Sequence, residues 1–463
     1  MFVSYGSTGL SIPHERYTTL NSRGMPMSEE VTHESWFSRL GNSIKGVLVG
    51  AAIFLAAFPL LWWNEGRAIT TAKALKAGAA AVQETTGESV SPEQEGKFVH
   101  LTGESTTDEV LEDTEFGVSA NAIRLTRKTE MYQWRENQSS QTRKTLGGGT
   151  ETVTTYSYEK NWFARAIDSG SFREPGHDNP GELPFQTSTT EARDVRLGEY
   201  QLPASLVSKI QGSEALAVKL EDLPERIRSE FRPHGANGFY WSQRQVAARQ
   251  QSVTAVAGHA VTTDAPQTGV NRTVENASPR IGDVRVTFFV TRPATVSIMS
   301  QQQRNSFTPF KTSNGRELHM LAMGTVPASE MITAAERENT IWTWALRTIG
   351  FVMMGVGLGL VFKPMSVLAD VLPIAGDLVE MGTSLVSFVI AGACSLTTIS
   401  LAWLFYRPLI GAPLLVAAIG LVGVLVKLML KARSARSATS TANVTKPVTE
   451  TNAAVEETLG VSS

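Results

Sequence analysis

The sequence has almost no cysteine and no excess of either charge. Its 463 residues include a single cysteine, Cys394, which excludes an intramolecular disulfide and any multi-cysteine zinc or iron–sulfur site. The 42 Lys and Arg residues balance 44 Asp and Glu residues to a net charge of −2, whereas a dedicated nucleic-acid-binding protein usually carries a basic excess. We therefore expect no nucleic-acid partner. With 42% apolar residues, the chain is too apolar to be disordered as a whole.

The sequence also lacks the patterns of common catalytic and metal sites. It contains no His-Glu-x-x-His, no Gly-x-Ser-x-Gly, and no two histidines at metal-ligand spacing. The run Gly147-Gly148-Gly149 lacks the Gly-Lys-Ser/Thr ending of a phosphate loop. The most suggestive pair is His177-Asp178 in a loop, for which a surface turn is the simpler interpretation. We therefore predict no catalytic residue, no metal and no cofactor.

What the sequence does contain is four long apolar blocks. The first, 45–63, is just long enough to cross a hydrocarbon core of roughly 30 Å, and it ends on Trp62 and Trp63, as at a membrane interface. A cleavable signal peptide is the alternative, but a long mixed-charge segment precedes the block and no close cleavage site follows it. The other blocks are 341–362, 381–405 and 409–426. We predict an integral membrane protein with four transmembrane helices, one N-terminal and three C-terminal.

The basic residues that follow the fourth block predict a cytoplasmic C-terminus; they are Lys427, Lys431, Arg433 and Arg436. Four spans then return the N-terminus to the same side. The predicted order is a disordered cytoplasmic segment 1–44, span 45–63, an extracytoplasmic domain 64–340, span 341–362, a cytoplasmic connector 363–380, span 381–405, a tight turn 406–408, span 409–426, and a cytoplasmic tail 427–463, basic and then of low complexity. We expect the acidic residues of the connector, Asp370, Asp377 and Glu380, to be solvated.

The domain between the first two spans is predicted to be α+β and rich in antiparallel strands. Apolar and polar residues alternate in KFVHLTG, AIRLTRKTEMYQW, TVTTYSY and DVRVTFFV, which is typical of half-buried strands. The glycines 147–149 predict a hairpin tip between two of them. An alanine-rich helix is expected over 70–84, and short helices over 202–210 and 220–231.

Two groups of residues are candidates for a role in the membrane. Small residues four apart let helix backbones approach closely, which predicts packing at Gly46, Gly50, Gly355 and Gly359. Polar and aromatic residues at the ends of the blocks predict a membrane-interface motif, made of Asn64, Glu65, Gly66, Arg67, Trp344, Arg347, Tyr406, Arg407 and Pro408. Glu65 and Arg67 are expected to pair with lipid headgroups, or with Arg347 and Glu338, and to fix the domain on the membrane surface.

Several of these motifs together resemble the transmembrane protein 43 (LUMA) family. They are Asn64-Glu65-Gly66-Arg67, the runs 95–100, 130–134 and 282–286, Pro309-Phe310, and the runs 343–347 and 403–408. The resemblance covers roughly 38–427 and departs in the first 35 residues, in about 235–280 and in the last 30. It implies the fold and topology above. Animal members lie in the endoplasmic reticulum and inner nuclear membrane, where they organise membrane protein complexes with lamins and emerin. Bacterial members have no lamina to bind.

The leading functional hypothesis is a non-enzymatic organiser of membrane complexes whose partners are membrane lipids, other membrane proteins and a second copy of the chain. It is expected in the bacterial cytoplasmic membrane, or in the endoplasmic reticulum and inner nuclear membrane of a eukaryote. One alternative is a membrane-bound enzyme that acts on lipid or envelope substrates near Glu65, Arg67 and His177. The other is an oligomeric channel or transporter.

Overall fold

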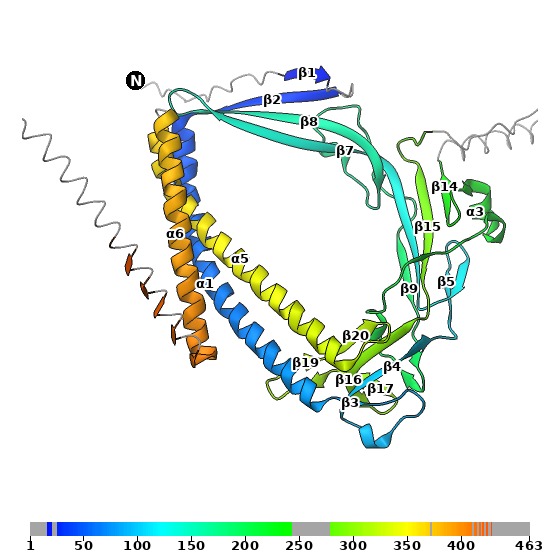
Figure 1. Ribbon diagram of the computed structural model, residues 1–463. Helices are drawn as coiled ribbons and strands as arrows, with labels where there is room; N and C mark the ends of the chain where they lie inside the picture. Colours follow the sequence, from blue (N-terminus) through cyan, green and yellow to red (C-terminus); the bar gives the residue numbers. More distant parts are fainter. Residues whose placement is uncertain are drawn as a thin grey trace, which may run out of the picture. The chain divides into compact units, whose positions relative to one another are not determined.

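The chain divides into two compact units. The computed structural model describes residues 16–20, 26–242, 278–370 and 373–409, and isolated positions between 412 and 427 (Figure 1). The strand-rich unit comprises Met1–Leu40, Thr70–Thr340 and Val367–Gly376, and the helical unit comprises Gly41–Ile69, Ile341–Ser366 and Asp377–Ser463. Half of the predicted fourth span, 409–426, and nearly all of the predicted tail, 427–463, lie outside the described residues.

Among the described residues, three helices are long and apolar enough to cross a membrane, which agrees with the first three apolar blocks. They are α1 (Trp36–Ala81), α5 (Ala328–Ala369) and α6 (Pro373–Tyr406). The Ser35 side chain caps α1 by accepting from the backbone N–H of Ser38, and α1 continues past Pro59 without a break. At about 1.5 Å per residue, a helix of this length is roughly 69 Å long, more than twice what a bilayer core needs. The predicted alanine-rich helix is therefore the end of α1.

The strand-rich unit contains two main sheets, and all their described pairings are antiparallel except that of β3 with β4. The larger sheet has the described order β1-β2-β8-β7-β15-β14-β13, with β12 on β15 and β9 on β7. Its strands are β1 (Arg16–Leu20), β2 (Pro26–Glu34), β7 (Arg124–Lys144), β8 (Thr150–Phe163), β9 (Ser188–Glu191), β12 (Glu214–Ala215), β13 (Phe231–Pro233), β14 (Gly238–Trp241) and β15 (Val284–Thr291).

The smaller sheet has the described order β11-β10-β4-β16-β17, with β20 on β16 and β3 on β4, and two separate hairpins pair β5 with β6 and β18 with β19. Their strands are β3 (Gln83–Glu84), β4 (Phe98–Thr106), β5 (Val110–Asp113), β6 (Val118–Asn121), β10 (Arg196–Leu197), β11 (Tyr200–Gln201), β16 (Thr295–Gln303), β17 (Ser306–Thr308), β18 (Phe310–Lys311), β19 (Glu317–Leu318) and β20 (Met320–Met323).

The helices predicted inside this unit are shorter than expected. The segment 202–210 contributes only α2 (Ala204–Val207), and 220–231 is divided into a 3-10 turn (Leu220–Asp222) and α3 (Glu225–Glu230). Two further 3-10 turns are Pro92–Gln94 and Ser169–Ser171. Pro224 explains the division, because it lacks the N–H that a continuous helix would need there. The α+β class with an antiparallel bias is confirmed.

The β7–β8 hairpin is the longest pairing and carries the predicted tip. Its register runs from Met131↔Phe163 to Lys144↔Thr150, and Gly147 and Gly148 take positive φ angles of 87° and 80° in the turn. β2 pairs with the other edge of β8, from Met27↔Ser157 to Glu34↔Thr150. The prediction that 1–44 is a disordered segment is therefore wrong for 26–34. Backbone hydrogen bonds to β8 hold this strand, and sequence periodicity could not reveal that partner.

The two sheets enclose the main core of the strand-rich unit. Leucine, valine and phenylalanine side chains fill it, and Phe116 makes edge contacts with Phe185, Phe231 and Phe288. A second cluster packs the ends of α1 and α5 on the smaller sheet, and it contains Ala74, Leu75, Phe98, Met299, Leu318, Ala328, Met331 and Ile332. Burial of this apolar surface stabilises the helical turns of α1 and α5 that lie beyond the apolar blocks. Both helices therefore extend into the strand-rich unit.

Six residues from three distant segments meet at the hairpin tip, and we call this group the Asp370 clasp; it contains Trp36, Arg39, Lys144, Gly148, Val367 and Asp370. Arg39 Nη2 donates to Asp370 Oδ2 at 2.6 Å, and Lys144 Nζ lies 3.0 Å from Asp370 Oδ1. Asp370 is only 1% exposed, so the prediction of a solvated acidic connector is wrong at this position. The predicted placement of 1–44 and 363–380 on the opposite side of a membrane from 64–340 stays a prediction.

The helical unit packs around Ala57, Leu61, Met354 and Ala391, all fully buried. The predicted packing glycines are only partly in place. A Cβ at position 50 would lie 2.6 Å from the carbonyl oxygen of Gly357, and one at position 355 would just touch Ala391.

Gly46 and Gly359, in contrast, have no other described atom within 4 Å of such a Cβ. The close approach on α5 instead uses Gly350 and Gly357, which are two helical turns apart and so share one face. The spacing of small residues in the sequence does not identify which face of a helix packs against a neighbouring helix.

Candidate functional site in the helical unit

A buried ion pair joins two of the apolar helices. Glu65 on α1 is 1% exposed, and Arg347 on α5 donates to it in a bidentate arrangement, Nε to Oε1 at 2.7 Å and Nη2 to Oε2 at 2.8 Å. Two parallel charge-assisted bonds are the strongest way in which arginine holds a carboxylate. Arg347 lies inside the predicted second span, so that span carries a charge, and the charge is neutralised within the unit.

A third helix completes this arrangement, which we call the Glu65 node; it comprises Glu65, Arg347 and Trp403. The indole N–H of Trp403 on α6 donates to Glu65 Oε2. The Arg347 guanidinium lies 5.4 Å from the centre of the Trp403 ring and 4.9 Å from that of Trp344, within the range of cation–π attraction. Both carboxylate oxygens are engaged, and α1, α5 and α6 are tied together at one point.

The neighbouring polar residues of the predicted motif also bind within the unit. Asn64 is fully buried and donates from Nδ2 to the Thr343 carbonyl oxygen at 3.0 Å. Arg67 Nη2 donates to Asn64 Oδ1 at 3.4 Å and to Thr343 Oγ1 at 3.3 Å. Arg67 thus contacts α5 through Thr343, whereas Glu338, the acidic partner considered from sequence, is exposed.

The remaining motif residues divide into packed and exposed positions. A Cβ at Gly66 would lie 2.7 Å from the Tyr406 hydroxyl oxygen, so this glycine makes room for the tyrosine. Trp344, Arg407 and Pro408 are exposed, which suits an interface, and Trp344 also contacts the Arg347 guanidinium. The structure therefore gathers Asn64, Glu65, Gly66, Arg67, Arg347 and Tyr406 by contacts among α1, α5 and α6.

His177 does not offer a catalytic group. Its ring stacks on Tyr158 at 3.8 Å between centroids and meets Trp134 edge-on at 4.6 Å. Burial, followed by the hydrogen bond to Glu136, raises the pKa of the Tyr158 hydroxyl, so the phenol stays protonated. The histidine is a buried packing residue rather than part of the exposed turn expected from sequence.

A serine–histidine–serine chain that sequence did not predict lies beside the smaller sheet. Ser300 Oγ donates to the Thr308 carbonyl oxygen at 2.6 Å, so it accepts from His319 Nδ1 at 2.7 Å. His319 Nε2 then accepts from Ser205 Oγ at 2.8 Å. Burial, and next the charge of Lys209, lowers the pKa of His319 to about 4.

That geometry gives a hydroxyl beside an imidazole, but the imidazole is a weak base. A general base works best with a pKa near the working pH, and nucleophilic triads use a carboxylate to stabilise the imidazolium that forms. Here the third member is the Ser300 hydroxyl, which cannot do so. We therefore interpret the chain as a structural link between α2, β16 and the segment before β20.

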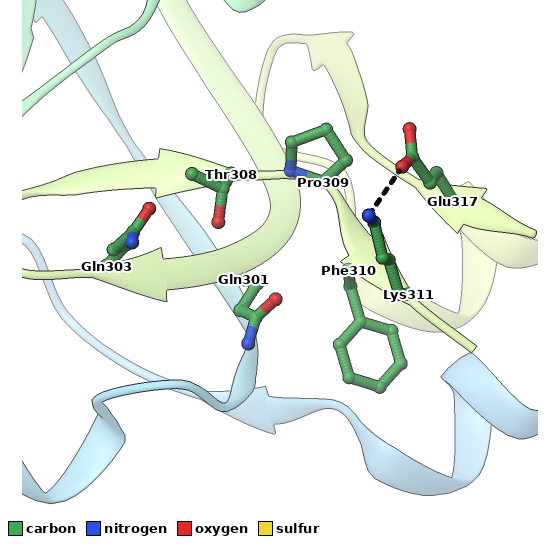
Figure 2. A pocket seen from close by; sticks show the side chains of 7 residues that line it. All are labelled: Gln301, Gln303, Thr308, Pro309, Phe310, Lys311 and Glu317. Carbon is green, nitrogen blue, oxygen red and sulfur yellow. Dashed lines mark ion pairs between the residues drawn. The ribbon is translucent and has the colours of Figure 1, made fainter. Parts of the chain in front are cut away.

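One open hollow of about 460 Å³ lies on the strand-rich unit; Figure 2 shows its lining residues, Gln301, Gln303, Thr308, Pro309, Phe310, Lys311 and Glu317. Lys311 and Glu317 pair at 3.6 Å, and Gln301 Nε2 donates to the Gly96 carbonyl oxygen. Among the described residues, no group of three or more His, Cys, Asp or Glu side chains is arranged to hold a metal ion.

Sequence reasoning missed Trp403 and Thr343. A tryptophan near the end of an apolar block is typical of the membrane interface, so nothing marked Trp403 as a hydrogen-bond donor to a residue 338 positions away. The available signal was the coincidence of a lone acid, Glu65, and a lone base, Arg347, at the ends of two blocks. Charges at such positions are costly unless they are paired.

The chain is similar in sequence to known membrane proteins. The family model described as Transmembrane protein 43 matches residues 131–408. Transmembrane protein 43 of Mus musculus and of Homo sapiens are each 31% identical to the chain over 441 residues, covering 92% of it and 97% of the relative. The Transmembrane protein 43 homolog of Drosophila melanogaster is 26% identical over 382 residues, covering 80% of the chain and 91% of the relative. No solved structure matches the chain.

The family match covers more than half of the chain and includes both Arg347 and Trp403 of the Glu65 node. The mouse and human relatives extend the similarity over nearly the whole length. This chain is a membrane protein that belongs to the transmembrane protein 43 family.

Proposed function

We propose that the chain is a non-enzymatic organiser of membrane protein complexes and of the lipids around them. The observation that carries the proposal is the Glu65 node, in which one buried carboxylate uses both oxygens to hold three helices together. A carboxylate engaged in this way has no free oxygen with which to attack or deprotonate a substrate. Its effect is to fix the arrangement of the helices, which a scaffold needs and a catalyst does not.

The outer surface of the helical unit supports binding to lipids or other membrane helices. Large apolar side chains are exposed on all three helices, among them Leu48, Leu55, Ile349, Val352, Val356, Leu385, Phe388 and Leu401. A contiguous exposed apolar surface marks a contact with membrane or protein. The partners proposed are membrane lipids, other membrane proteins and a second copy of the chain.

The proposal includes a fourth apolar helix over 409–426, supported by its composition. It also places the protein in the cytoplasmic membrane of a bacterium, or in the endoplasmic reticulum and inner nuclear membrane of a eukaryotic cell. Support for a membrane location comes from the apolar helices and from the names of the relatives. No assignment of sides is included.

The test is crosslinking in intact membranes, extraction in a gentle detergent, and identification of co-purifying proteins and lipids. Leu55→Ala should lower recovery of a specific partner several-fold, because Leu55 is 64% exposed on α1. Val110→Ala is the matched control, since Val110 is 62% exposed but belongs to the strand-rich unit, and it should leave recovery unchanged. Recovery of free monomers alone, without protein or lipid, would contradict the proposal.

A further inference from the structure

Three aromatic rings from two helices form one continuous surface in the helical unit, and we call it the Trp62 cluster; it comprises Trp62 on α1 and Phe405 and Tyr406 at the end of α6. The Trp62 ring centroid lies 6.0 Å from that of Phe405 and 6.2 Å from that of Tyr406. The two α6 rings meet edge-on at 5.0 Å. Phe405 is 72% exposed and Trp62 is 38% exposed, so the cluster presents aromatic surface outward.

Gly66 fixes the position of one of these rings. A Cβ at this residue would lie 2.7 Å from the Tyr406 hydroxyl oxygen and 2.9 Å from Tyr406 Cζ, so a larger side chain would push the ring away from α1. Gly66 follows Trp62 by four residues and therefore lies on the same face of α1. One helical face thus supplies both the indole of the cluster and the space that receives the tyrosine.

The polar groups on this surface are available to a ligand. Among the described residues, no polar group bonds to the Tyr406 hydroxyl or to the Trp62 indole N–H, and no carboxylate pairs with the Arg407 guanidinium. Arg407 is exposed in the turn that directly follows Tyr406. The surface therefore combines electron-rich ring faces with one cation and two neutral hydrogen-bond donors.

A phosphocholine group matches this combination. Its quaternary ammonium carries no N–H, so it needs no hydrogen-bond acceptor, and aromatic faces attract such a cation within about 6 Å of the ring centre. Its phosphate accepts from a guanidinium in a charge-assisted bond, and it can also accept from a phenol and an indole N–H. Each end of this zwitterion thus meets groups of complementary charge.

The other common headgroups match less well. An ethanolamine ammonium has three N–H donors, and the carboxylate of Glu65, on this part of α1, already accepts from Arg347 and Trp403 with both oxygens. A glycerol headgroup brings a phosphate for Arg407 but no cation for the rings. The chemistry of the surface therefore distinguishes choline from both.

We propose that the Trp62 cluster and Arg407 bind the headgroup of phosphatidylcholine, with the ring faces on the trimethylammonium and the guanidinium on the phosphate. Trp62 lies near the end of the first apolar block and Phe405 ends the third, which are positions where aromatic residues meet headgroups. This inference rests on the proposed function, in which membrane lipids are partners, and it adds the lipid class and the residues that select it.

The test is lipid competition on the purified full chain in detergent, read by native mass spectrometry. The probe is an equimolar mixture of phosphatidylcholine, phosphatidylethanolamine and phosphatidylglycerol with identical acyl chains. The original chain should retain phosphatidylcholine in about fivefold excess or more, and Phe405→Leu, which removes a ring but keeps apolar bulk, should reduce that excess about two- to fivefold. Phe388→Leu is the matched control, since Phe388 is 61% exposed on the same helix but lies inside the block 381–405. It should leave the excess unchanged.

Arg407→Gln separates the two ends of the headgroup. It should lower retention of all three lipids alike, because each carries the phosphate, and it should keep the preference for choline. A changed preference would contradict the assignment of Arg407 to the phosphate. Trp62→Leu repeats the test of the rings on α1 if Phe405→Leu does not fold.

Two results would overturn the inference: no preference for phosphatidylcholine in the original chain, or equal losses of preference in Phe405→Leu and Phe388→Leu. Lipid retained without a choline preference would leave the proposed function intact. Recovery of monomers with neither protein nor lipid, in contrast, contradicts the proposed function itself, so the two failures are distinguishable.

Discussion

Two buried carboxylates, Glu65 in the helical unit and Asp370 in the strand-rich unit, are held in different ways. Glu65 receives one bidentate arginine and one indole N–H. Asp370 receives a separate cation on each oxygen, from Arg39 and Lys144. Both are 1% exposed, yet loss of one partner leaves Asp370 with a second cation and leaves Glu65 with none. The Glu65 node should therefore be the less tolerant of substitution.

The largest effect is expected from Arg347→Ala. Removing one partner of a buried ion pair leaves an uncompensated charge and costs about 3–5 kcal/mol of stability. Denaturation of the detergent-solubilised protein, followed by tryptophan fluorescence, measures the loss. The double variant Glu65→Leu with Arg347→Met is the control, and it should recover much of the stability because it removes both charges. A double variant as unstable as Arg347→Ala would show that the pair acts through packing instead.

Sequence identified the members of the first pair and gave their pairing as one of two alternatives, the other being lipid headgroups; the structure shows the ion pair. Glu65 and Arg347 are 282 residues apart, and each stood out because it is an isolated charge beside an apolar block. Trp403 did not stand out, because a tryptophan near the end of an apolar block is equally typical of the lipid headgroup layer. Asp370 was misread for a related reason: Asp370, Asp377 and Glu380 look like a solvated acidic run, and only tertiary contacts bring Arg39 and Lys144 to the first of them.

The fold shows the same division between local and long-range information. The strands around 98–106, 124–144, 150–163 and 284–291 and the glycine turn at the β7–β8 tip follow from alternation and from positive φ, which are local properties. The pairing of β2 with β8 joins residues more than a hundred positions apart across an apolar helix. No pattern within residues 26–34 identifies that partner, so the sequence could not predict this strand.

A smaller effect is expected from Asp370→Ala, of about 1–3 kcal/mol, as for removal of a buried hydrogen-bonding partner. The side chains of Arg39 and Lys144 are 12% and 22% exposed, so they can regain water once the carboxylate is gone. Hydrogen exchange measured by mass spectrometry should accelerate at residues 144–150 and stay unchanged in β15. Equal acceleration in both would mean that the clasp supports the whole sheet, and the contrast with Glu65 would be lost.

Glycine packing between the helices gives a still smaller effect. Two Gly→Ala substitutions on α1 should change stability in opposite directions. Gly50→Ala should destabilise the helical unit by about 1–2 kcal/mol, because its Cβ would lie 2.6 Å from the Gly357 carbonyl oxygen and force a shift. Gly46→Ala lies one turn away on the same helix with no other described atom near it, and it should stabilise by about 0.5–1 kcal/mol through helix propensity. Thermal unfolding in detergent compares the two. Effects of the same sign would place the close contact elsewhere.

The smallest effect is a pH dependence that involves neither carboxylate. Burial lowers the pKa of His319 from its ordinary 6.5 to about 4 in the folded protein, so the folded state favours the neutral ring and the unfolded state binds the proton more readily. Stability from this residue is therefore complete above pH 6.5 and is lost as pH falls from 6.5 toward 4. His319 is only partly buried, so solvent keeps the effect modest.

His319→Gln tests this assignment, because glutamine keeps hydrogen-bonding capacity toward Ser205 and Ser300 but does not titrate. The variant should lose some stability at pH 7 and show a smaller further loss between pH 6.5 and 4 than the original chain. Melting temperatures at several pH values in that window measure both. If the two proteins lose stability in parallel, the acid sensitivity belongs to other groups, and His319 contributes only its hydrogen bonds to the link between α2 and β16.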